Sequence, residues 1–237
     1  MMSNKLVILT GTAAAMGLMH TLMGPDHYLP FIVLSKSRQW SVWRTGLTTL
    51  LCGLGHVGSS VVLGLIGISL GVALTTLTST ESFRGQIAAW FLTAFGLVYL
   101  VWGIRRAIRN KPHTHAHGHA SEPAHSHEHN HVREHTHPHT ASGKKSPTPW
   151  VLFIIFVFGP CEPLIPILMY PAAAESFWGL LIVASVFALV TIGTMMAVVL
   201  VSTFVIDLLP STKLARYSHA LAGAAISMCG LAIHLGL

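Results

Sequence analysis

The stretch His20-Thr-Leu-Met-Gly24-Pro25-Asp26-His27 decides how the rest of the chain is interpreted. It places two imidazoles and a carboxylate inside a long apolar run, on either side of a Gly-Pro pair. Ionisable groups are costly in lipid, and where they occur they mark functional sites with partners nearby. Proline removes a helical hydrogen bond, and irregular backbone in a membrane is tolerated only where it is buried or lines a cavity. The stretch therefore predicts a broken helix that holds an ion.

The composition indicates an integral membrane protein. The chain has 237 residues, of which 52% are hydrophobic and only 9% are charged, and its mean hydropathy is +0.62. A soluble domain carries about 25% charged residues. The formal charge of +6 is mostly Lys and Arg beside apolar runs, which orients a membrane protein and gives no reason to expect nucleic acid. All three cysteines lie in apolar segments, so no disulfide framework is indicated.

Six apolar segments are expected to cross the bilayer, because each approaches or exceeds the roughly 20 residues that a spanning helix needs. Their approximate bounds are 6–34, 45–77, 87–104, 150–170, 178–206 and 217–237. A short loop is expected at 78–86. Lys and Arg cluster after the first, third and fifth segments. The positive-inside rule then predicts an inner-membrane protein with the loop after the third segment in the cytoplasm and both termini outside.

The two halves of the chain match at a fixed offset of 135 residues. Under this register Gly24 and Pro25 correspond to Gly159 and Pro160, and His56 corresponds to Thr191. Each half has an odd number of spans, so the second half would be inserted upside down, as in transporters built from inverted repeats with broken helices. We therefore predict an all-α membrane fold of six transmembrane helices in two inverted three-helix repeats, with broken first and fourth helices. The predicted domains are 1–111, 112–149 and 150–237.

The segment 112–149 between the repeats cannot be a span. It has almost no large apolar residue, so we expect it to be disordered when metal-free. Its His-x-His alternation places neighbouring side chains on one side of an extended chain, which predicts metal binding; a merely solvating linker is the alternative. Its eleven histidines are His113, His115, His117, His119, His125, His127, His129, His131, His135, His137 and His139.

The predicted metal ligands within the membrane are His20, Asp26, His27, His56 and Glu162. Neutral imidazole suits Ni²⁺, Co²⁺, Zn²⁺ and Cu²⁺, and a carboxylate widens the choice toward harder ions. Alternatives stay open, since His20 would also serve as a hydrogen-bond donor to a carbonyl at the break, and Asp26 as a helix cap. Glu162 would act as a ligand, a proton carrier or a cap. Secondary candidates, for which packing is the alternative, are Cys161, Ser59 and Thr194.

These motifs resemble the nickel/cobalt transporter superfamily, particularly UreH-like transmembrane proteins and RcnA-type efflux proteins. The resemblance rests on the His-rich loop and on three motifs, which are His20 with Asp26-His27, Gly55-His56 and Gly159-Pro160-Cys161. It implies Ni²⁺ or Co²⁺ as the transported substrate. The imidazole ligands make Zn²⁺ a further candidate, and we expect no prosthetic group. It also implies a cytoplasmic metallochaperone or urease assembly proteins as partners.

The predicted function is transmembrane transport of a divalent transition-metal ion by alternating access, without enzymatic chemistry. Three alternatives stay open. The same superfamily is similar to TauE/SafE-type exporters of sulfite or organosulfonate anions, which the N-termini of half-helices would attract. It is also similar to thiol–disulfide electron carriers of cytochrome c maturation, which need two apposed cysteines. The last alternative is a membrane chaperone that passes metal to urease assembly without transporting it.

Overall fold

The structure, a computed structural model, describes residues 4–109, 113–119, 122–129, 147–174, 177–208 and 216–236. The helices are α1 (Asn4–Met23), the 3-10 helix η1 (Pro25–His27), α2 (Leu29–Ser37), α3 (Val42–Ser69), α4 (Leu74–Arg109), α5 (Thr148–Phe158), α6 (Leu164–Ala174), α7 (Phe177–Leu208) and α8 (Ser218–His234). In the described ranges α1, α3, α4 and α7 are long and apolar enough to cross a membrane, and α5 and α8 are shorter apolar helices. The protein is therefore a multi-pass membrane protein whose membrane part is α-helical.

The first helix breaks where the Gly-Pro pair predicts. Helix α1 ends at Met23, and the chain makes the short η1 turn before α2 begins at Leu29. Pro25 has no N–H to continue the α1 ladder, and the N–H of His27 bonds the carbonyl of Gly24 at 3.0 Å instead. The second Gly-Pro pair has the same effect, because α5 ends at Phe158 and α6 begins at Leu164.

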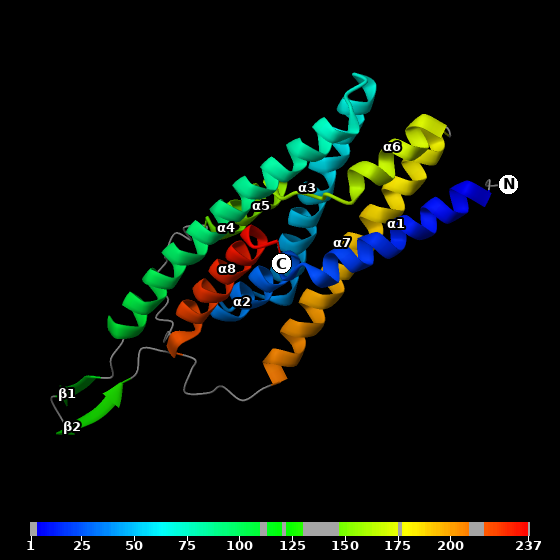
Figure 1. The fold of residues 1–237 in the computed structure, drawn as a ribbon. Helices are drawn as coiled ribbons and strands as arrows, with labels where there is room; N and C mark the ends of the chain where they lie inside the picture. Colours follow the sequence, from blue (N-terminus) through cyan, green and yellow to red (C-terminus); the bar gives the residue numbers. More distant parts are fainter. Residues whose placement is uncertain are drawn as a thin grey trace.

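The helix boundaries of the two halves share one offset. Met23 and Phe158 end the half-helices, Leu29 and Leu164 restart them, and each pair of residues is 135 apart. The following long helices α3 and α7 also begin 135 residues apart. Helix α1 packs on α7, and the corresponding helix of the second half, α5, packs on α3. Helix α3 also contacts α7, and α4 contacts α8 (Figure 1). If each helix is replaced by its counterpart in the other half, the same four contacts result.

Helices α4 and α8 make the most extensive helix contact, along a seam of glycines. A Cβ added at Gly223 would lie 2.2 Å from the backbone nitrogen of Leu100, and one at Gly103 would lie 2.4 Å from that of Ala220. Gly96 and Gly230 are similarly crowded. Small residues allow helices to approach closely in a membrane, where apolar side chains gain little by leaving lipid. The glycines therefore set the distance between α4 and α8.

Two clusters of buried apolar side chains flank the centre of the molecule. One contains Phe31, Phe156 and Ile226, and the other contains Leu164 and Phe187. Cys52 of α3 belongs to the first cluster and Val57 of the same helix to the second. The middle of α3 therefore lies between the two clusters.

The structure corrects two expectations about the segments. The loop expected at 78–86 is wrong, because these residues are helical within α4. The turn lies earlier, between Ser69 and Leu74, where Gly71 adopts a φ of +66°. Glycine takes this left-handed conformation without steric cost, and the chain reverses there.

The histidine-rich segment was expected to lack regular structure, but part of its backbone forms an antiparallel hairpin of β1 (His113–His119) and β2 (Glu122–His129). The register pairs His113 with His129, His115 with His127 and His117 with His125. Four of the predicted loop ligands lie outside the described residues, namely His131, His135, His137 and His139.

Candidate metal centre

Three histidine side chains meet at the first helix break. His20 lies in the last turn of α1, His27 ends η1, and His56 lies in the middle of α3. The Nε2 atom of His27 is 3.1 Å from Nε2 of His20 and 3.3 Å from Nε2 of His56. We call these three residues the histidine cluster. An unbroken helix would carry His27 away along the axis of α1, so the Gly-Pro break is what turns it back toward His20 and α3.

The spacing of the nitrogens fits a tetrahedral metal ion. Metal–imidazole bonds of about 2.0–2.1 Å in tetrahedral geometry place neighbouring ligand nitrogens roughly 3.3 Å apart. Two of the three separations match this value, and all three ligand atoms lie within 4.8 Å of one another. The rings of His20 and His56 are nearly parallel, and the ring of His27 stands edge-on to both. Three protein ligands leave the fourth position of such an ion open.

The hydrogen bonds of His27 orient its ring so that the lone pair of Nε2 faces the cluster. Its Nδ1 lies 3.1 Å from the carbonyl oxygen of Gly24 and 3.2 Å from Oδ1 of Asp26. Both partners are acceptors, so in the neutral ring Nδ1 carries the proton and Nε2 is free to bind an ion. Asp26 therefore orients His27 through the ring atom opposite the cluster. A Cβ at residue 24 would lie 2.5 Å from the His27 ring, so this arrangement needs Gly24.

His56 is held in a comparable way. It is hydrogen-bonded to the backbone of Phe156, near the end of α5, and its Nε2 faces His27. The side chains of His27 and His56 are almost fully buried, and His20 is partly buried. Phe187 lies beside His20, and Phe156 lies beside His56. Imidazole nitrogens that converge inside an apolar surround repel one another unless protons or a cation lie between them.

A small cavity adjoins the cluster. It has a volume of about 30 Å³, and its lining includes Asp26, His27, His56, Gly159 and Pro160. The lining therefore joins the first helix break to the second. A space of this size holds a water molecule or an ion.

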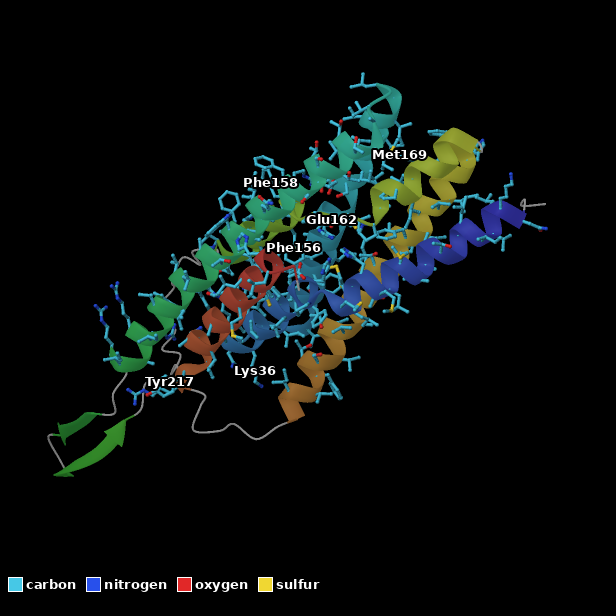
Figure 2. The ribbon with its side chains drawn as sticks, in the orientation of Figure 1. Lys36, Phe156, Phe158, Glu162, Met169 and Tyr217 are labelled. Atoms are coloured by element: carbon cyan, nitrogen blue, oxygen red, sulfur yellow. The ribbon has the colours of Figure 1, made fainter. Side chains whose placement is uncertain are left out.

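The remaining predicted site residues lie outside the cluster in the part of the chain that the structure describes. Cys161 is fully buried within the second break, whereas Glu162 beside it is exposed, and Figure 2 labels Glu162 between α5 and α6. Thr194 is partly buried on α7. Ser59 lies one turn from His56 and donates to its carbonyl oxygen at 2.9 Å.

Sequence reasoning missed two charged residues close to the site. Glu81 and Arg84 were assigned to a loop, but the structure places them on α4 as a buried ion pair. Arg84 donates to Ser59, the neighbour of the cluster on α3. A spacing of three residues between opposite charges on a helix was the available sequence signal.

The comparisons with known proteins overturn one expectation. A family model described as "Cytochrome C biogenesis protein transmembrane region" matches residues 10–232, which is nearly the whole chain. No curated protein and no solved structure matches. The assignment to the nickel/cobalt transporter superfamily, and to its UreH-like branch, is therefore wrong. The chain belongs to the family of the cytochrome C biogenesis protein transmembrane region.

Proposed function

We propose that the protein carries a divalent transition-metal ion across the membrane, with the histidine cluster as the binding site on the route. The observation that carries this proposal is the convergence of three Nε2 atoms at a helix break. Imidazole ligands favour Ni²⁺, Co²⁺, Zn²⁺ or Cu²⁺ over Mg²⁺ and Ca²⁺. An ion bound by three side chains and one exchangeable ligand can leave again, as transport requires.

The paired breaks support an alternating-access mechanism. Equivalent helix boundaries in the two halves agree with an inverted repeat of six membrane segments in which α5 with α6 forms the broken fourth segment. In such an arrangement the two halves rock around a site near the middle of the bilayer. We further propose that the basic end of α4, at Arg105, Arg106 and Arg109, faces the cytoplasm, which places the His-rich hairpin there and both termini outside.

The hairpin would serve as an ion buffer at the cytoplasmic mouth. Its register brings pairs of histidines opposite each other at every second residue, for example His115 opposite His127. Residues at this spacing share one face of a two-stranded sheet. We propose that this segment collects ions, or exchanges them with a cytoplasmic metal-binding protein, without selecting the metal.

The family match favours a second candidate function, a thiol–disulfide electron carrier. That function needs two cysteines that meet. Cys161 lies within the second break at the position equivalent to Asp26, and it packs in a different apolar cluster from Cys52. Both thiols are free and buried in the structure. A Cys161→Ser variant separates the candidates, because an electron carrier loses all activity whereas the proposed ion carrier retains it. An exporter of sulfite-like anions is tested by anion flux in the same vesicles.

The test is ion uptake by the purified protein in proteoliposomes, with Ni²⁺, Co²⁺ and Zn²⁺ offered separately. We expect flux of at least one of these ions, and its loss in His27→Ala. The matched control is His234→Ala, which removes a partly buried imidazole whose buried Nε2 has no hydrogen-bond partner in the described structure. Flux that survives His27→Ala, or anion flux without metal flux, would contradict the proposal.

A further inference from the structure

A buried ion pair lies close to the histidine cluster. Glu81 and Arg84 are one turn apart on α4 and contact each other through Oε1 and Nη1. Glu81 is fully buried, and the Arg84 side chain is 16% exposed. Charged groups persist in such an environment only with hydrogen-bonding partners, and apolar packing would stabilise the helices as well or better. The pair is therefore better explained by a role beyond stability.

The partners of the pair lie in the second helix break and in the last turn of α5 before it. Glu81 Oε2 accepts from the backbone N–H of Cys161, within the break, at 3.2 Å. Arg84 Nη2 donates to the carbonyl oxygen of Val157 at 2.7 Å, just before the break. Between these two contacts Pro160 packs on α4 so closely that a Cβ at Gly85 would lie 2.7 Å from it. The pair thus fastens the break, residues 159–163, to α4.

The same pair fastens the break to α3. Glu81 Oε2 accepts from the hydroxyl of Ser60 at 3.0 Å, and Arg84 Nη2 donates to Ser59 at 2.7 Å. We call Glu81 and Arg84, with these bonds to α3 and to the break, the clamp. The contacts of the clamp on α3 lie one helical turn after His56, toward the loop that connects α3 to α4.

The fastened break is a wall of the ion site. A Cβ at Gly159 would lie 3.0 Å from Nδ1 of His56, and both Gly159 and Pro160 line the cavity beside the cluster. Residues 159–163 lie between two helices, so their backbone can move without opening a helical ladder. The clamp contacts α3 one helical turn from His56 and therefore lies beside this wall, on the side of the α3–α4 turn.

We propose that the clamp is the gate that closes the histidine cluster toward the α3–α4 end, and that the break swings away from α4 when the clamp opens. The proposal rests on the proposed function, since a gate needs an ion to admit. In this account the charges are useful because water can replace their partners when the break moves away, whereas an apolar contact would gain nothing from water.

The chain holds its own reporter of this movement. Cys161 is fully buried, and its backbone is bonded to the clamp. It is one of three cysteines in the sequence, so a Cys52→Ala/Cys229→Ala background leaves it as the remaining thiol. N-ethylmaleimide then labels Cys161 in the full chain at a rate set by how often the break opens.

The test variant is Glu81→Gln/Arg84→Gln, which removes both charges together and so avoids leaving one unpaired in the membrane. We expect Cys161 labelling to rise about tenfold, because neutral hydrogen bonds are roughly half as strong as charged ones and the opening equilibrium shifts accordingly. Metal affinity should stay within about threefold of the parent, since the histidine cluster is unchanged. The matched control Ser79→Ala removes an exposed hydroxyl that bonds Thr75 within the same helix, and it should leave labelling unchanged.

Two outcomes would contradict the proposal that the clamp is a gate. Unchanged Cys161 labelling in the double variant would show that the charges do not hold the break. Increased labelling together with a lower melting temperature and weaker metal binding would show that the pair only stabilises the fold. If the parent chain binds no metal, the proposed function fails independently of the labelling result.

Discussion

Asp26 offers the most detailed prediction about the ion site. Its carboxylate contacts Nδ1 of His27 at 3.2 Å, and the ring then presents Nε2 to His20 and His56. Partners that orient a metal-bound histidine are typically worth 10–100-fold in metal affinity. Each factor of ten corresponds to about 1.4 kcal/mol, so removing the carboxylate should weaken binding by about 1.4–2.8 kcal/mol.

Two substitutions separate the contribution of the Asp26 charge from that of its hydrogen-bond acceptor. Asp26→Asn keeps an oxygen that can accept from Nδ1 but removes the charge, so we expect a loss of about tenfold in metal affinity. Asp26→Ala removes the acceptor as well, and His27 keeps the carbonyl of Gly24 as its remaining partner in the described structure. The expected loss of metal affinity is then about a hundredfold. His27→Ala deletes a ligand and should abolish measurable binding.

The assay is competition of the purified protein with a chelator for Co²⁺ or Ni²⁺ in detergent. Loss of all binding in Asp26→Ala, as in His27→Ala, would show that the carboxylate is itself a ligand. Unchanged affinity in both Asp26 variants would show that the hydrogen bond to His27 does not matter for binding. Either result would refute the reasoning from the hydrogen-bond geometry.

Two further predictions concern the helix seam and the hairpin. Gly223→Ala should destabilise the protein by about 1–3 kcal/mol in thermal unfolding, because its methyl group would collide with the backbone of α4. Gly58→Ala, where nothing lies within 4 Å, should be as stable as the parent or more so; equal stability of the two variants would contradict the packing. Deletion of residues 113–139 should lower ion flux without abolishing it, and complete loss in the same uptake assay would assign selection of the metal to this segment.

The positions of the helix breaks and of the three histidines were predictable because their signals are local. Gly24-Pro25 interrupts the helical ladder by covalent structure alone, whatever the rest of the fold does. Imidazoles at His20 and His27 are too polar for lipid and so indicate an interior site. His56 was predicted to lie with them because it is flanked by glycines on the next span, and glycines allow another segment to approach closely.

The clamp was not predictable for a different reason. Glu81 and Arg84 look like loop residues to any hydropathy argument, because their burial is compensated by partners far away in the chain. Cys161 is 80 residues from Glu81, and Val157 is 73 residues from Arg84. The preceding turn depends on Gly71, one of 21 glycines, and the sequence does not distinguish it from glycines inside helices. Tertiary contacts decided both features.

The site predictions were uneven for a related reason. Asp26 and His27 are adjacent in the chain, so their proximity was guaranteed, whereas Glu162 was placed in the site through the repeat alone. The repeat fixes the backbone position of Glu162 but not the burial of its side chain, which is exposed. The family assignment failed because it rested on a few short histidine and Gly-Pro motifs, whereas the family match extends over residues 10–232.

The most direct test of the ion site is Co²⁺ absorption spectroscopy on the purified protein with residues 113–139 deleted, so that loop histidines do not contribute. Tetrahedral coordination by imidazole gives Co²⁺ d–d bands that are much more intense, and lie at longer wavelength, than those of the hydrated octahedral ion. The account predicts such bands at saturation with a single ion per chain, their loss in His27→Ala and their retention in His234→Ala. Absence of the bands from the parent, or their persistence in His27→Ala, would contradict it.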